Sequence, residues 1–136
     1  MIDHLSIGVA DLARAKQFYD AVLQALGCAC IFTVDVPDHG VVSHGYGVIG
    51  TDHPRFWIGV PERLDAAANA QGGAHLCFEA KRRKDVDAFH AAALAAGGKD
   101  NGKPGLRPHY HPNYYGAFAF DPDGNKIEAC SHHPEP

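Results

Sequence analysis

The chain has 136 residues, a length that suits one folded domain whose core needs no disulfide or metal staples. Hydrophobic residues make up 46% of the chain and charged residues 21%, a composition that excludes an intrinsically disordered protein. The formal net charge of -4 offers no basic surface for nucleic acid or an anionic membrane, so we expect a small-molecule partner.

The first predicted element is a strand at residues 2–9, in which apolar and polar residues alternate. A helix follows it, with Asp11 as the expected N-cap and Gly27 as the expected end. Apolar residues recur along this helix at helical spacing, namely Leu12, Ala15, Tyr19, Val22, Leu23 and Leu26. Three short strand candidates come next, at residues 28–36, 41–50 and 54–61.

The chain contains an internal duplication. Residues 4–27 align without a gap on residues 75–98. The matched pairs include His4 with His75, Leu5 with Leu76, Phe18 with Phe89 and Gly27 with Gly98. The second half therefore starts with a strand at His75, followed by a helix at about residues 85–96.

The end of the second half supplies three further strand candidates. They are a Gly-rich segment, YYGAFAF at residues 114–120 and NKIEACS at residues 125–131. The DPDG sequence at residues 121–124 places Pro and Gly where a tight turn needs them, so the last two strands form a hairpin. Linkers are expected at about residues 61–73, between the halves, and 99–113.

The strands of both halves have a polar face that faces away from the helices. If the apolar strand faces pack under the helices, the polar faces line a shared cavity. His4 and His75 lie on these faces at equivalent positions, and we expect a pseudo-twofold axis to bring them close together. Glu128 joins them, because it shares its strand face with Lys126 and Cys130.

Three segments resemble the vicinal oxygen chelate superfamily, which holds glyoxalases, extradiol dioxygenases, fosfomycin-resistance enzymes and bleomycin-binding proteins. They are HLSIGV near the start, the repeated HL at residues 75–76 and DPDGNKIEA at residues 121–129. The resemblance covers essentially the whole chain and implies an α+β fold of two βαβββ modules that form a cupped eight-stranded mixed sheet. It implies one domain over residues 1–136, with module 1 at about 1–60 and module 2 at about 74–131.

The resemblance also implies a metal site at His4, His75 and Glu128. Two imidazoles and one carboxylate suit a divalent ion such as Fe, Mn, Zn or Ni, with open positions for a chelating substrate. A dioxygenase- or lyase-like enzyme is the function expected from this site. The alternative is a metal-free protein of the bleomycin-resistance type, which binds and sequesters a small molecule.

The duplication tests for a fourth metal ligand, which enzymes resembling glyoxalase I carry on their fourth strand. The position equivalent to Glu128 is Trp57, whose side chain cannot bind a metal ion. This departure argues against a simple methylglyoxal-glutathione lyase. Trp57 is either a wall for a flat substrate or an ordinary core residue.

The loop before the last hairpin holds the candidates for proton transfer. By resemblance to extradiol dioxygenases, we expect His109, His111 and Tyr115 to be catalytic, and Tyr114 to be a further hydrogen-bond donor to substrate. The alternative is that this aromatic loop is an ordered lid. A Tyr that dioxygenases and fosfomycin enzymes tend to have on the next strand is missing, since Phe118 and Phe120 stand there.

Few cations are expected near the cup, which favours an uncharged or aromatic substrate over glutathione or a phosphonate. The expected substrate-binding residues are Trp57, Tyr114, Phe118 and Arg107. His132 and His133 follow the last strand and are predicted to be a frayed tail rather than metal ligands.

The four cysteines include no CxxC pair and no secretory leader precedes them, so we expect a reduced, soluble, cytoplasmic protein. Cys28 and Cys30 are either buried apolar residues or, less favoured, ligands of a soft metal. No apolar run approaches the length of a membrane span. A homodimer is expected from the resemblance, with each cup completed within a chain or between chains.

Overall fold

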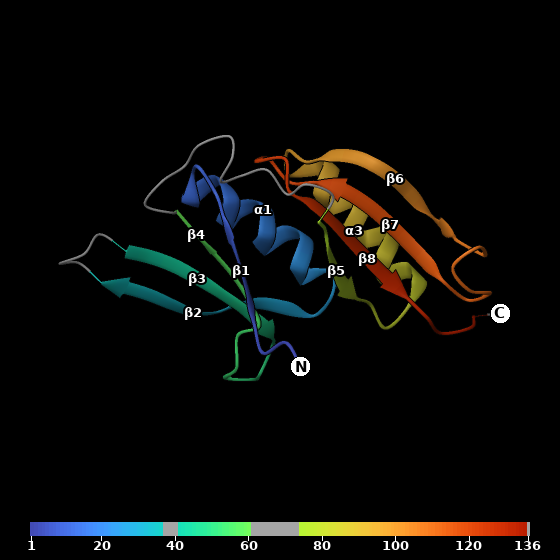
Figure 1. Ribbon diagram of the computed structural model, residues 1–136, viewed down its shortest axis with the longest axis horizontal. Helices are drawn as coiled ribbons and strands as arrows, with labels where there is room; N and C mark the ends of the chain where they lie inside the picture. Colours follow the sequence, from blue (N-terminus) through green and yellow to red (C-terminus); the bar gives the residue numbers. More distant parts are fainter. Residues whose placement is uncertain (37–40, 61–73, 136) are drawn as a thin grey trace.

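The computed structural model describes residues 1–36, 41–60 and 74–135, which form two sheets that each carry one helix (Figure 1). The first module consists of β1 (Leu5–Gly8), α1 (Leu12–Gln24), β2 (Cys28–Val36), β3 (Val41–Val48) and β4 (Phe56–Gly59). The second consists of β5 (Leu76–Glu79), α3 (Arg83–Ala95), β6 (Lys99–Leu106), β7 (Tyr115–Phe120) and β8 (Lys126–Ser131). These are the two βαβββ modules expected from the sequence. The predicted linker at residues 61–73 lies outside the described residues.

The duplication is visible in the element boundaries. Adding 71 to the bounds of β1 and α1 gives 76–79 and 83–95, which are the bounds of β5 and α3. The same offset relates the strand registers, because Leu5 pairs with Phe56 in the first module and Leu76 pairs with Ile127 in the second. The two halves are therefore structural copies, and positions 71 residues apart can be compared directly.

The eight strands are divided between two four-stranded mixed sheets, in the orders β1-β4-β3-β2 and β5-β8-β7-β6. In each sheet the strand before the helix runs parallel to the last strand of its module, and the other pairs are antiparallel. Part of the predicted linker at 99–113 is strand β6, whose pairing with β7 shifts register around Gly102. Backbone pairing with β7 thus overrides the weak strand preference of a Gly-rich segment.

The core lies between the sheets and the two described helices, α1 and α3, and these helices pack on each other. Helix α1 begins as expected, because the Asp11 carboxylate accepts a hydrogen bond from the backbone N–H of Arg14. It is followed by Gly27, whose φ of 75° is a left-handed conformation that favours glycine. The residues that α1 buries are Ala15, Phe18, Tyr19, Val22 and Leu23. Neither described helix is long and apolar enough to cross a membrane.

The DPDG turn joins the two modules. Asp121 is buried, and its carboxylate accepts hydrogen bonds from the backbone of Asp123 and Asn125 and from the side chain of Asn125. It also accepts one from the Tyr19 hydroxyl of α1 at 2.6 Å. The Asp123 carboxylate accepts from the backbone N–H of Ala10, next to the start of α1. The turn that leads into β8 is therefore fixed against the first module, and this fixes the strand that carries Glu128.

Candidate metal and substrate site

Glu128 lies on the face of β8 that points away from the helix. Its neighbours Ile127 and Ala129 are fully buried in the core, so the alternation of a strand places Glu128 and Cys130 on the opposite face. The parallel register with β5 sets Cys77 beside Glu128. Although it lies on the open side of the sheet, Glu128 is only 2% exposed, because other side chains cover it.

Two side chains satisfy the buried carboxylate. The His75 Nε2 lies 3.0 Å from Oε2 of Glu128, and the Tyr114 hydroxyl donates to Oε1. Gly116 leaves room for this arrangement, because a Cβ there would lie 3.2 Å from Oε1 of Glu128 and 3.0 Å from the Tyr114 ring. Burial is the main cause that raises the pKa of Tyr114, with the hydrogen bond to Glu128 second, so this phenol stays a donor at neutral pH.

This pair fits one half of a divalent metal site. An imidazole nitrogen and a carboxylate oxygen lie side by side, and this donor set suits Fe, Mn, Zn or Ni. A buried carboxylate needs partners, and a bound cation would be one in addition to His75 and Tyr114. The residues present therefore agree with the expected ion at His75 and Glu128.

His4 lies apart from that pair. It is exposed, and its Nδ1 lies 2.7 Å from Oδ1 of Asp3. His4 lines a hollow of about 450 Å³ on the first sheet, whereas His75 and Glu128 line a second hollow of about 450 Å³ on the second sheet, and the two share no lining residue. Among the described side chains, His4, His75 and Glu128 do not form one ligand cluster. The expected approach of His4 to His75 is therefore not made within one chain.

Trp57 stands at the position equivalent to Glu128, as the duplication predicts. Ser6 pairs with Trp57 in the first module, and Cys77 pairs with Glu128 in the second. The indole is partly exposed and lines the first hollow, so Trp57 is not an ordinary core residue. Gly45 makes room for it, because a Cβ there would lie 2.8 Å from the indole ring. The structure thus places an aromatic wall where a fourth metal ligand would stand.

Phe118 and Arg107, two of the residues predicted to bind substrate, line the second hollow. Phe118 pairs with Glu128 across β7 and β8, and its ring lies 6.1 Å from that of His75. The Arg107 guanidinium and the Lys126 ammonium lie 5.8 Å and 5.3 Å from the Phe118 ring. This hollow is more cationic than the sequence suggested, since Lys126 lies beside Arg107 there.

Tyr115 does not lie at the site, contrary to expectation. Its hydroxyl donates to Oδ1 of Asp87 on α3 at 2.7 Å, and its ring lies 5.5 Å below the Arg83 guanidinium. The alternation of β7 is the reason, because it sends adjacent residues to opposite faces. Tyr114 faces Glu128, and Tyr115 therefore faces the helix.

The two candidate acid/base histidines occupy the loop before β7. The His109 ring packs at 4.4 Å against Tyr110, and Tyr110 lines the second hollow together with Glu128. His111 lies near the end of the chain instead, with its Nε2 2.6 Å from Nδ1 of His132 and the two rings stacked. The prediction of His132 as part of a frayed tail is wrong, because His111 holds its ring.

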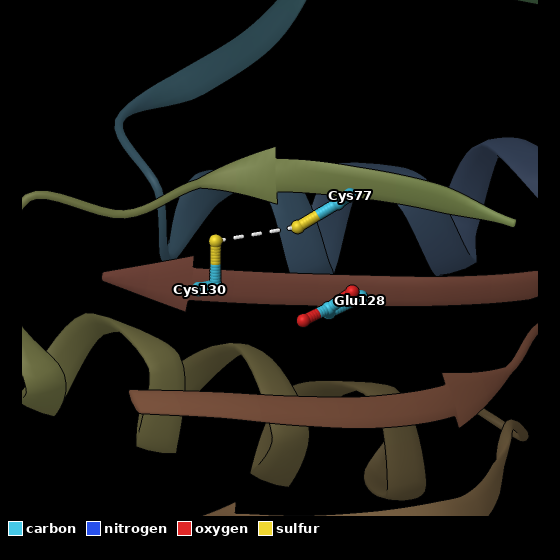
Figure 2. A group of neighbouring side chains, drawn as sticks. All are labelled: Cys77, Glu128 and Cys130. Atoms are coloured by element: carbon cyan, nitrogen blue, oxygen red, sulfur yellow. Dashed lines mark hydrogen bonds between the residues drawn. The ribbon is translucent and has the colours of Figure 1, made fainter. Parts of the chain in front are cut away.

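The sequence reasoning missed a cluster of two cysteines around Glu128. Figure 2 shows Cys77 of β5 and Cys130 of β8 pointing toward each other, with sulfur atoms 3.3 Å apart. One ligand atom each from Cys77, Cys130 and Glu128 lie within 4.8 Å of one another. The signal was present, since each cysteine follows a predicted ligand by two residues on the same strand face. What was missing was the register that pairs these two strands.

The hydrogen bond between the two thiols shifts their pKa values in opposite directions. The hydrogen bond from Cys77 is the main cause that lowers the pKa of Cys130 to about 6, with a smaller contribution from Tyr114. The same hydrogen bond, together with burial, raises the pKa of Cys77. Cys77 is therefore the hydrogen-bond donor of the pair and Cys130 the acceptor.

Comparison with known proteins places the chain in a family. The model of the Glyoxalase/Bleomycin resistance protein/Dioxygenase superfamily matches residues 1–129. A glyoxalase/bleomycin resistance protein from Albidiferax ferrireducens T118 is 34% identical, with a TM-score of 0.73 over 95% of this chain and 97% of that one. A glyoxalase-related enzyme from Fulvimarina pelagi is 17% identical, with a TM-score of 0.68 over 96% of this chain and 87% of that one.

A third match is glyoxalase I from Zea mays, at 22% identity and a TM-score of 0.69 over 96% of this chain but 45% of that one. The likeness to the Fulvimarina pelagi and Zea mays structures is one of fold alone. No curated protein matches the sequence. The family model, the 34% identical structure and the paired βαβββ modules agree with the resemblance seen in the motifs. The chain therefore belongs to the glyoxalase/bleomycin resistance protein/dioxygenase superfamily.

Proposed function

We propose that the protein is a metal-dependent enzyme, dioxygenase- or lyase-like, that acts on a small substrate with two adjacent oxygen atoms. The ion is a divalent Fe, Mn, Zn or Ni, held by His4, His75 and Glu128. The observation that carries this proposal is the buried Glu128 carboxylate with His75 Nε2 at 3.0 Å. A carboxylate and an imidazole in this relation suit a divalent cation and leave coordination positions for a chelating substrate.

A second copy of the chain supplies His4 in this proposal. Because His4 and the pair of His75 and Glu128 line different hollows, one chain offers two half-sites. A twofold dimer places the first hollow of each chain over the second hollow of its partner and so creates two equal sites. Exposed apolar side chains on the first module, such as Val48 and Ile49 at 58% and 59%, support such burial.

Each half-site makes a different contribution to substrate binding. A bound divalent ion supplies Lewis acidity, which lowers the pKa of a substrate hydroxyl or polarises a carbonyl group. Tyr114 holds Glu128 in place by its hydrogen bond, and Phe118 offers an apolar surface next to His75.

The remaining residues contact the substrate away from the ion. Arg107 attracts a negative oxygen of the substrate, while Trp57 stacks on a flat group from the facing half-site. His109 and His111 are the candidates for proton transfer from the bordering loop.

Metal content tests the proposal directly. Protein purified without a metal-affinity column is reconstituted with Fe(II), Mn(II), Zn(II) or Ni(II), and bound metal is measured by elemental analysis. With Fe(II) or Mn(II), which do not favour the cysteine pair, the expected content is about one ion per chain, lost in His4→Ala and Glu128→Ala and kept in the control His133→Ala. Wild-type protein that binds none of the four ions would overturn the proposal. Oxidation of a panel of catechols, with and without a chelator, then tests the dioxygenase reaction.

Mixed dimers test where His4 comes from. Chains with His4→Ala and chains with Glu128→Ala are unfolded together, refolded and reconstituted. If sites form between chains, half of the dimers are mixed and each of these has one intact site, so about a quarter of the wild-type metal content returns. If sites form within a chain, none returns, which would contradict the shared arrangement.

A metal-free binding protein is the second candidate, and one observation favours it. Trp57 lines the first hollow, and its ring meets that of Phe32 edge to face with ring centroids 6.2 Å apart. Such a surface binds flat apolar molecules without any ion. Quenching of Trp57 fluorescence by an aromatic ligand at equal strength with and without chelator supports this candidate over the enzyme.

A further inference from the structure

The cysteine pair beside Glu128 has no role in the proposed enzyme, yet its geometry is that of a metal site. Cys77 and Cys130 are on neighbouring parallel strands, and their sulfur atoms are 3.3 Å apart. Both side chains lie on the same face as Glu128 (Figure 2). We propose that Cys77, Cys130 and Glu128 bind a thiophilic divalent cation such as Zn²⁺, with the fourth position open to water or a small ligand.

The distances suit tetrahedral coordination. With Zn–S bonds of about 2.3 Å and tetrahedral angles, two thiolate sulfurs lie about 3.8 Å apart. The thiols at 3.3 Å therefore separate by only about half an ångström to admit the ion. The Glu128 oxygen already lies within 4.8 Å of both sulfurs, close enough to complete a three-ligand face. Thiolate ligands select Zn²⁺ over Mg²⁺ or Ca²⁺.

The sheet holds the ligands in place. Cys77 pairs with Glu128 and Glu79 pairs with Cys130 in the parallel ladder, so the backbone at each ligand is fixed. Cys130 and Glu128 are 5% and 2% exposed, whereas Cys77 is exposed and leaves a route for the ion. Little ordering is needed on binding, which favours affinity.

Two histidines form a chain of hydrogen bonds that leads to the sulfur of Cys130. The backbone N–H of Asn113 donates to Nδ1 of His111, so a neutral His111 carries its proton on Nε2 and donates it to Nδ1 of His132. A neutral His132 then carries its own proton on Nε2, which lies 3.5 Å from the Cys130 sulfur. The chain of donors ends on Cys130. It orients the Cys130 sulfur toward the ion, as outer-shell partners of metal ligands do.

This site and the proposed enzyme site share the ligand Glu128 and lie next to the same His111, but their other metal ligands differ. The thiol site needs neither His4 nor a second copy of the chain, and the enzyme site needs neither cysteine. An ion held by the cysteines draws on the same carboxylate that His75 contacts, so each ion weakens binding of the other. The two proposals can therefore fail separately, and the variants below distinguish them.

Cobalt absorption identifies thiolate ligands. Co²⁺ is added to reduced protein, and thiolate-to-cobalt charge-transfer absorption in the near ultraviolet is followed to saturation at about one ion per chain. The band is expected to disappear in Cys77→Ser and in Cys130→Ser. It is expected to persist in the control Cys28→Ser/Cys30→Ser and in His4→Ala, which removes a ligand of the enzyme site only. No band in the wild type, or a band that survives both cluster substitutions, overturns the proposal.

Alkylation of the wild-type protein gives a test that needs no variant. Reduced protein is treated with iodoacetamide with and without Zn²⁺, and labelled cysteines are located by mass spectrometry of its peptides. Zn²⁺ is expected to slow labelling of Cys77 and Cys130 at least tenfold while Cys28 and Cys30 react as before, since a metal-bound thiolate is a poor nucleophile. Equal labelling of Cys77 and Cys130 in both conditions contradicts a site at these residues.

Discussion

Removal of one hydroxyl group, in Tyr19→Phe, tests the link between the two modules. Tyr19 is 0% exposed, and its hydroxyl donates to the Asp121 carboxylate at 2.6 Å. Asp121 is itself only 3% exposed, so water does not replace the lost donor. The substitution keeps the ring and its packing, and it removes only this hydrogen bond.

The expected cost follows from the partners of Asp121. A hydrogen bond to a charged group contributes about 1.5–3 kcal/mol to stability. Three other donors from Asp123 and Asn125 remain on the carboxylate, so the lower part of that range, about 1.5–2 kcal/mol, is expected. With a urea m-value of about 1–3 kcal/mol/M, the midpoint of unfolding falls by about 1 M.

Urea unfolding followed by circular dichroism measures this change. The control is Tyr110→Phe, because Tyr110 is 56% exposed, and it is expected to stay within about 0.5 kcal/mol of the wild type. The variant Asp121→Asn and its double variant with Tyr19→Phe complete a double-mutant cycle, in which a coupling of at least about 0.5 kcal/mol is expected. A free energy of unfolding for Tyr19→Phe equal to that of the control refutes the reasoning.

Three further outcomes are expected. Gly116→Ala pushes a Cβ against Glu128 and weakens metal binding at least about tenfold in a titration, whereas in Gly105→Ala the Cβ meets only the far end of the Arg107 side chain and metal binding is unchanged. Burial raises the pKa of Tyr19 and Tyr46, so the folded state keeps protons that the unfolded state loses above pH about 10. The free energy of unfolding is therefore full below that pH and falls above it in urea titrations. Removal of bound metal by a chelator lowers the melting temperature, and a metal-independent melting temperature contradicts the metal site.

The fold was largely predictable because the signals are local or repeated. Strand alternation predicted that Ile127 and Ala129 pack inward and that Glu128 faces the other way. Ile127 and Ala129 are both fully buried in the core, which agrees with this prediction. The duplication carried the assignment of the first strand and helix onto the second half, where the bounds differ by 71 residues throughout. The Gly-rich strand β6 was the weakest prediction, because its pairing partner β7 stabilises it more than its own residues do.

The candidate site was predictable only in part. The motif and the repeat identified His75 and Glu128. In the structure, His75 Nε2 and Glu128 Oε2 lie 3.0 Å apart. They did not determine the face of Tyr115, because the phase of β7 depends on its pairing with β8. His132 and the cysteine pair were missed for a similar reason, since each depends on a contact between residues far apart in the sequence.

The sequence by itself determined the two copies of the module, the hairpin turn and the residue types available at the site, because these depend on local pattern and on the repeat. Only the tertiary structure decided which side chains meet. Parallel pairing of β5 with β8 sets Cys77 between Glu128 and Cys130, and the packing of the modules leaves His4 in a separate hollow. Such contacts join strands about fifty residues apart, where only the register of the sheet, and no local preference, selects the partner.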